Sequence, residues 1–190
     1  MVVKGLDFEH VKLVGILDAD SLLGFADFRV NERAFQLMEQ VSGRAGRKGA
    51  RGKVMIQVAN TRHPVLQYVA AHDYPAFYAF EIESRKNFFY PPFCRLIKIT
   101  FRHAIKPVVD DAALIFTDAL KNEFEKFLVG PAEPIVNRTR NQYIMELLIK
   151  LPREAQIINH CKKRVLEEVA RIHQEKRFRS VVIIADVDPG

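Results

Sequence analysis

Two arginines three residues apart carry the strongest chemical signal in the sequence. Arg44 and Arg47 stand in the segment QVSGRAGR, residues 40–47, where glycines let the backbone approach a ligand closely. Guanidinium groups held in this way neutralise the charge that develops on a transferring γ-phosphate. Gln40, on the predicted helix just before them, can hydrogen-bond the same phosphate or the attacking water. The pattern indicates phosphoryl transfer; the alternative is a basic loop that contacts solvent or nucleic acid.

The placement of charge supports a phosphate partner. The net charge is +6, and five cations fall within ten residues that contain no acidic side chain: Arg44, Arg47, Lys48, Arg51 and Lys53. Such a cluster attracts a nucleotide or a nucleic acid. A second basic cluster lies near the C-terminus. The candidate DNA contacts are Lys4, Lys48, Arg51, Arg177 and Arg179.

Composition excludes several classes of protein. The 190 residues are 48% apolar and 27% charged, which is typical of a globular protein that can bury a core. Cys94 and Cys161 are the two cysteines and neither has a CxxC neighbour, so no disulfide framework and no zinc site is expected from this chain alone. No apolar run approaches membrane-spanning length and the N-terminus lacks a signal-peptide pattern. We expect a cytoplasmic protein without a membrane partner.

The first sixty residues are predicted to form an α/β unit. The apolar run 11–18 is typical of a strand buried in a parallel sheet. Asn31 is the expected N-cap of a helix that turns Phe35 and Met38 inward. The alternation over 53–59 predicts another strand. Strand, helix and strand in this order indicate an α/β sheet.

An aromatic helical stretch follows and ends at a proline pair. Residues 63–90 are predicted to be helical, and their aromatic side chains fit a packed core better than a base-stacking surface. Pro91 and Pro92 cannot donate backbone hydrogen bonds and end the helix. The expected domains are residues 1–60, a connector at 61–92 and a C-terminal domain at 93–190.

The C-terminal domain is predicted to have the βαββαβ order of a ferredoxin-like fold, and so an α+β architecture. The expected elements are a strand at 94–103, a helix at 107–128, a short strand near 134–136, a strand at 142–150, a helix after Pro152 and a buried strand at 181–185. Gly130 and Pro131 are expected to stop the first helix.

Two segments together resemble the motifs of superfamily 2 helicases. QxxGRxGR, after a strand and a helix, resembles motif VI, and Lys4-Gly5-Leu6-Asp7-Phe8 before the strand at 11–18 resembles motif V. The resemblance implies part of the second RecA-like lobe of a translocating ATPase. It also implies that Gly5, Asp7 and Gly43 lie at the nucleotide.

The longer series of motifs narrows the resemblance to one family. Tyr90-Pro91-Pro92-Phe93 and the terminal Asp186-Val187-Asp188-Pro189 follow QVSGRAGR, and the whole series resembles the PriA family of replication-restart helicases (primosomal protein N′). The resemblance implies an ATP-dependent DNA helicase that recognises abandoned forks, unwinds the lagging-strand arm and helps to reload the replicative helicase. It implies binding of branched and single-stranded DNA, of the single-strand-binding protein and of primosome and helicase-loading proteins, at the nucleoid.

The sequence departs from the family pattern in two ways. It has no GxxxxGK[ST] segment and none of the family's zinc-binding cysteines, so ATP, Mg²⁺ and zinc would be held by residues outside this chain, which alone is expected to be inactive. The family's alternating arginines and aromatics are absent near Tyr143. Arg138 and Arg140 supply the charge instead, which predicts a partner site at these three residues; otherwise Tyr143 belongs to the core or to a strand face.

Two other functions stay open at this stage. The chain could be a non-enzymatic nucleic-acid-binding or assembly module, whose basic loop grips phosphates. An unrelated α/β enzyme is less favoured because the histidines lack ligand spacing and no convincing nucleophile or base is present.

Overall fold

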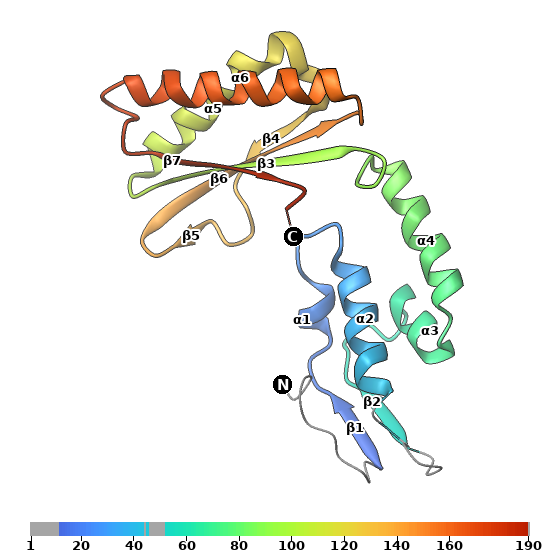
Figure 1. The fold of residues 1–190 in the computed structure, drawn as a ribbon. Coiled ribbons are helices and arrows are strands. Elements are labelled where there is room, and N and C mark those ends of the chain that lie inside the picture. Colours follow the sequence, from blue (N-terminus) through green and yellow to red (C-terminus); the bar gives the residue numbers. More distant parts are fainter. Residues whose placement is uncertain (1–11, 44, 46–51, 190) are drawn as a thin grey trace. The chain divides into compact units, whose positions relative to one another are not determined.

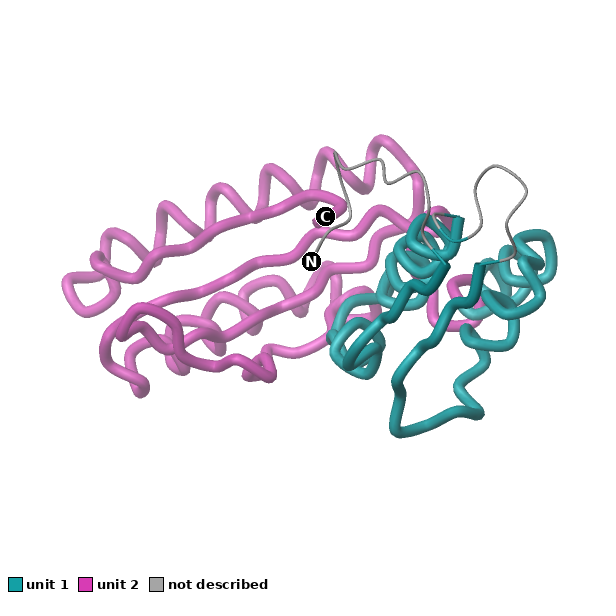
Figure 2. The backbone as a smooth tube through the Cα atoms, turned by 90° about the horizontal axis from the view of Figure 1, so that it is seen from below, with its two compact units in different colours: residues 1–84 teal, residues 85–190 magenta. Residues whose placement is uncertain are grey.

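The computed structural model describes residues 12–43, 45 and 52–189 and shows a mixed α/β protein. The chain divides into two compact units, residues 1–84 and 85–190 (Figure 2). The predicted connector at 61–92 spans the boundary between these units. Each unit has a hydrophobic core of its own.

Unit 1 is built on a pair of parallel strands. β1 (Leu13–Ile16) pairs with β2 (Lys53–Ile56) in the register Leu13↔Lys53. The helices α1 (Asp20–Leu23) and α2 (Val30–Ser42) lie between them in the sequence. Both strands fall within the ranges that the apolar patterns predict.

The core of unit 1 joins α2 to two later helices, α3 (Pro64–Ala71) and α4 (Tyr74–Asn87). Phe35 and Met38 of α2 are buried, as predicted, and the Phe35 ring stacks on that of Phe77 with 4.3 Å between centroids. Val65 and Val69 of α3 complete the same cluster.

The prediction that Asn31 caps α2 was wrong. The helix begins at Val30, and the Asn31 side chain in its first turn donates to the Glu81 carboxylate at 3.3 Å. Arg29 holds the N-cap position, and no side chain caps the helix there. The Asp27 carboxylate accepts the Arg29 backbone N–H at 2.8 Å just before the helix begins.

The predicted helical stretch over 63–90 consists of two helices, α3 and α4. His72 follows α3 in the left-handed region, with φ of 52°, which ends the first helix. The Asp73 carboxylate then accepts the Ala76 backbone N–H at 3.0 Å and starts α4. The left-handed residue His72 and the capping residue Asp73 therefore divide this helical stretch into α3 and α4.

Unit 2 is a sheet with two helices on one face, as Figure 1 shows. The strands are β3 (Arg95–His103), β4 (Leu128–Ala132), β5 (Arg138–Thr139), β6 (Gln142–Leu151) and β7 (Val182–Val187). Their order is β4-β6-β3-β7, with β5 against β6, and all pairings are antiparallel. The helices are α5 (Lys106–Phe124) and α6 (Ala155–Gln174).

The core of unit 2 lies between the sheet and these helices. Alternate residues of β3 and β6, such as Ile99 and Leu147, are fully buried beneath Phe116 of α5 and Ile172 of α6. Burying each such side chain stabilises the fold by about 1.5–3 kcal/mol. Buried side chains therefore recur with a period of two in the strands and of 3.6 in the helices, as the apolar patterns of the sequence indicate.

One strand and one helix end in unit 2 were predicted wrongly. The second strand is 128–132 and not 134–136, and α5 ends at Phe124 before a 3-10 turn, η2 (Glu125–Phe127). Gly130 and Pro131 lie within this strand, because a proline is tolerated at a sheet edge where its missing N–H would face solvent.

The last strand is exposed and not buried as predicted. β7 begins at Val182 and pairs with β3 alone, so it forms an edge of the sheet. Val182 and Ile184 are 43% and 42% exposed. An apolar run is typical of a strand that is covered on both faces. β7, however, lies at the edge of the sheet and has one open face, so much of it is in contact with water.

Candidate nucleic-acid interface

The QVSGRAGR segment begins at the end of α2. Gln40 and Gly43 are both exposed at this terminus, and the Gly43 backbone N–H donates to the Glu39 carbonyl at 2.9 Å. Gly43 has a helical φ of −63°, so its own conformation does not require glycine. The other predicted motor residues and loop cations lie outside the residues that the structure describes: Lys4, Gly5, Asp7, Arg44, Arg47, Lys48 and Arg51.

The remaining predicted cations gather at one end of the sheet of unit 2. This is the end at which β3 finishes and β6 and β7 begin. We call the following group the basic end: Arg102, His103, Arg138, Arg140, Tyr143 and Arg179.

The strand register brings the predicted partner site and the C-terminal DNA cluster together. Arg138 is the cross-strand partner of Tyr143, and Tyr143 is the partner of His103. The His103 ring nitrogen Nε2 lies 3.1 Å from the Ser180 hydroxyl, next to Arg179. Residues that lie about forty positions apart in the sequence are therefore neighbours in one surface.

The hairpin between β5 and β6 presents two arginines. Arg140 and Asn141 form its turn with φ of 50° and 60°, the positive values that a two-residue type I′ turn requires. Arg140 is exposed at this turn. Arg138 lies over the Tyr143 ring, with 4.9 Å from its guanidinium carbon to the ring centroid. Tyr143 itself is half-buried and packs against the core, so it has the strand-face position that was one of its two predicted roles.

Acidic side chains near the basic end are already paired. The Asp111 carboxylate accepts a hydrogen bond from Arg177, and Lys106 binds Glu133 and, at 2.9 Å, Asp110. These contacts neutralise the nearby carboxylates. Arg177, predicted as a DNA contact, is thus occupied by an internal ion pair, whereas Arg138, Arg140 and Arg179 carry the surface charge of this end.

Sequence reasoning missed Arg102 and Lys106. Arg102 lies opposite Val182 on β3, and alternation along that strand was the signal that placed it on the open face of the sheet. Lys106 stands in the first turn of α5, where only the fold brings it to Glu133. No spacing in the sequence predicts that contact.

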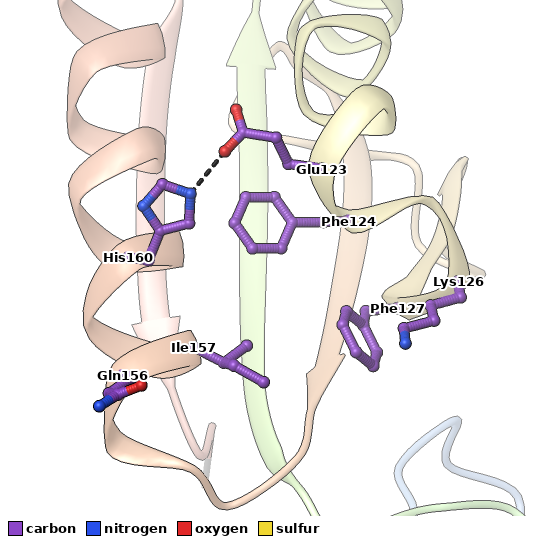
Figure 3. A pocket seen from close by; sticks show the side chains of 7 residues that line it. All are labelled: Glu123, Phe124, Lys126, Phe127, Gln156, Ile157 and His160. Carbon is purple, nitrogen blue, oxygen red and sulfur yellow. Dashed lines mark hydrogen bonds and ion pairs between the residues drawn. The ribbon is translucent and has the colours of Figure 1, made fainter.

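A separate pocket of about 560 Å³ opens where α5 ends and α6 begins (Figure 3). Its lining consists of Glu123, Phe124, Lys126, Phe127, Gln156, Ile157 and His160. The His160 ring lies 5.5 Å from the Phe124 ring. An apolar floor beneath polar side chains suits binding better than catalysis.

An ion-pair network borders this pocket. The Glu123 carboxylate lies 2.5 Å from His160 Nε2 and accepts the Arg164 Nε–H at 2.9 Å. Hydrogen bonds from His160 and then from Arg164 lower the pKa of Glu123 below its ordinary value. The contacts of Glu123 therefore link α5 to α6, whereas Arg164 also pairs with Glu167 and with the buried Glu168 within α6 itself.

Neither cysteine is suited to nucleophilic chemistry. Cys94 and Cys161 are both buried, and burial raises the pKa of each thiol from 9.0 to about 11. Within residues 12–43, 45 and 52–189, no three histidine, cysteine or acidic side chains are grouped to hold a metal ion. In that same part of the chain no helix is long and apolar enough to span a bilayer.

Comparisons with known proteins define the class and then the family. The sheet with two helices on one face and a cationic end identifies unit 2 as a small mixed α/β domain. Residues 86–190 match the family described as "Primosomal protein N C-terminal domain", so the chain belongs to that family.

Curated relatives match over the whole chain. "Replication restart protein PriA" of Synechocystis is 38% identical, that of Bacillus subtilis is 37% identical and that of Treponema pallidum is 36% identical, each over 100% of this chain. The matched regions make up 22%, 23% and 28% of those proteins. The chain therefore spans about a quarter of the length of these relatives.

Proposed function

We propose that this chain is the C-terminal part of an ATP-dependent DNA helicase that recognises abandoned replication forks, unwinds the lagging-strand arm and promotes primosome assembly. The single observation that carries the proposal is QVSGRAGR, which begins on α2 between two parallel strands and precedes a C-terminal domain of the primosomal protein family. A motor motif and a replication-restart domain in one chain favour this function over an unrelated α/β enzyme.

The two units would have different roles in this protein. Unit 1 would supply part of a RecA-like lobe within residues 1–60. Residues 61–92 would connect this lobe to residues 93–190, which would form a ferredoxin-like domain. The strand order β7-β3-β6-β4, with α5 and α6 on one face, supports the ferredoxin-like assignment, because each βαβ unit is then split by one antiparallel strand.

The motor residues would complete a nucleotide site held elsewhere. ATP and Mg²⁺ would be bound by residues outside this chain, because the sequence has no P-loop. Arg44 and Arg47 would neutralise the charge that develops on the γ-phosphate, and Gln40 would orient the attacking water. Gly5, Asp7 and Gly43 would border the nucleotide. The exposure of Gln40 at the end of α2 fits this role.

The basic end is the proposed DNA contact of unit 2. Arg138, Arg140 and Arg179 would bind backbone phosphates, and Lys4, Lys48 and Arg51 would do the same from unit 1. The same cations suit the acidic tail of a single-strand-binding protein. Helicase-loading and primosome proteins are further proposed partners, and the proposed place of action is the cytoplasm at the nucleoid.

Substitution of Arg47 in the full-length protein tests the motor assignment. Arg47→Ala is expected to lower DNA-stimulated ATP hydrolysis by roughly 10³-fold or more, because the guanidinium acts on the transition state. Arg62→Ala is the control, since it removes an exposed cation to which no nucleotide or DNA contact is assigned, and it should leave the rate nearly unchanged. A wild-type rate in Arg47→Ala would rule out the finger assignment.

A second function is favoured by one feature of unit 2. The basic end is formed wholly by residues 102–179 and needs no nucleotide, which suits a nucleic-acid-binding or assembly module. Under this alternative, DNA binding by the full-length protein would persist in Arg47→Ala, and no variant of QVSGRAGR would alter ATP hydrolysis.

A further inference from the structure

We propose that the β5–β6 hairpin binds single-stranded DNA by stacking a base on the guanidinium plane of Arg138, with Tyr143 as the residue that holds that plane flat. This inference rests on the proposed function only in taking DNA as the partner. It goes further by naming the residue on which a base of the single strand stacks and the residue that supports it.

The Arg138–Tyr143 pair forms one layer of a stack. The guanidinium carbon lies 4.9 Å from the ring centroid, and the ring is held because Tyr143 packs against the core of unit 2. Arg138 is exposed, which leaves its guanidinium group accessible from solvent. Exposed guanidinium and aromatic planes are surfaces on which unpaired bases stack.

The hairpin is fixed to the rest of the unit. The Ile144 backbone N–H donates to the Asn137 carbonyl at 2.9 Å, which ties its two arms together. The Asn137 side chain donates to Glu133 at 2.7 Å, and Glu133 in turn binds Lys106 in the first turn of α5. Arg138 therefore stands on a preorganised element, which reduces the entropy that binding must overcome.

Apolar side chains beside the arginine favour bases over phosphates alone. Ile135 and Val136 are 79% and 65% exposed, three and two residues before Arg138. Burial against the flat face of a base would remove this apolar surface from water. Duplex DNA hides its base faces within the helical stack, so only an unpaired strand offers them.

The charge of the hairpin suits a polyanion. Residues 134–145 contain Arg138 and Arg140 and no acidic residue, and the turn adds the amide side chains of Asn141 and Gln142. These groups donate hydrogen bonds to phosphate oxygens and to base edges. An acidic protein tail would satisfy the charges but would leave the exposed apolar pair without a partner, so the observations favour a DNA strand.

The test separates the plane of Arg138 from its charge. The 190-residue protein is titrated with a fluorescently labelled oligothymidylate and with a duplex of equal length. Arg138→Lys keeps the charge but removes the planar group, and it is expected to weaken single-strand binding by roughly 5-fold to 100-fold while duplex binding changes less than about 2-fold. Arg153→Lys is the matched control, because Arg153 is exposed beyond the opposite end of β6, and it should leave both affinities nearly unchanged.

Tyr143→Leu keeps apolar bulk in the core but removes the ring, and it should reproduce the selective loss of single-strand binding. Circular dichroism checks that this variant is folded; if it is not, Ile135→Ser, at an exposed position, replaces it and should also weaken single-strand binding selectively. Equal losses for both DNA forms, or no loss in Arg138→Lys, would overturn the stacking inference.

Two results distinguish this inference from the proposed function. If Arg179→Gln and Arg140→Gln weaken both DNA forms while Arg138→Lys changes neither, DNA binding at the basic end stands and stacking is wrong. If an aspartate-rich peptide binds in an Arg138-dependent manner and neither DNA form binds, the hairpin is a protein-binding site and both assignments to DNA are contradicted.

Discussion

At the scale of single residues, ion pairs within the protein decide which charged side chains are available to a ligand. Arg177 and Lys106 are committed to Asp111 and Glu133, so a count of cations overstates the charge that DNA can meet. The contact that stands out away from the basic end is the pair of Glu123 and His160, which joins the two long helices of unit 2.

The lowered pKa of Glu123 predicts how stability depends on pH. A carboxyl group whose pKa is lower in the folded state stabilises the fold above its unfolded pKa, near 4.5, and this contribution disappears as the pH falls through the folded value. Glu123→Gln should therefore lower the melting temperature at pH 7 but not in acid, where the carboxyl group of the native protein is itself protonated. Glu154→Gln, at an exposed position, is the control. If Glu123→Gln lowered the melting temperature as much at low pH as at pH 7, the assignment would be contradicted.

At the scale of elements, periodicity predicted most of the fold and backbone chemistry caused the errors. β3, β6, α2 and α6 lie where alternation and apolar stripes place them. β4 was missed because Gly130 and Pro131, which usually interrupt structure, occupy an edge strand with an irregular register. The predicted helical stretch over 63–90 is divided into two helices by the left-handed conformation of His72, a boundary that no hydrophobic pattern reports.

The site could be predicted only in part, for a related reason. The residue types of Arg138, Tyr143 and Arg179 suggested two separate sites in the sequence. These two sites lie together because β3 pairs with both β6 and β7. His103 at the end of β3 is therefore next to Tyr143 and to Ser180, which precedes β7. Register between distant strands is a tertiary property and is not encoded in local spacing.

Gly130 provides a test of the β4 geometry. Its φ is +106°, and a Cβ atom there would lie 3.0 Å from the Glu146 carbonyl oxygen. Gly130→Ala is expected to lower the free energy of unfolding by about 1–3 kcal/mol, measured by urea denaturation. Gly15→Ala serves as the control, because no atom lies within 4 Å of the added Cβ. Equal effects of the two substitutions would contradict the observed backbone of β4.

At the scale of the whole molecule, the residues that the structure describes form two separate cores. The cluster around Phe116 contains eighteen buried residues and that around Phe35 contains eight, which predicts that unit 2 is the more stable unit. The proposed nucleotide chemistry would belong to unit 1, and the described cationic surface belongs to unit 2.

Separate cores predict separate unfolding transitions. Phe116→Ala should lower the midpoint of the more stable transition, and Phe35→Ala that of the less stable one, each by an amount corresponding to about 3–5 kcal/mol. Scanning calorimetry with both variants provides the measurement. A single transition that both substitutions shift equally would show that the units unfold as one.

The most direct test of DNA recognition by unit 2 is a nuclear magnetic resonance titration of the 190-residue protein with an oligothymidylate. Backbone amide shifts are predicted to change at residues 138–143 and 177–180, which the sheet register brings together. Changes confined to Glu123, Gln156 and His160 around the helical pocket, with none in the hairpin, would contradict the assignment of the basic end as the DNA-binding surface.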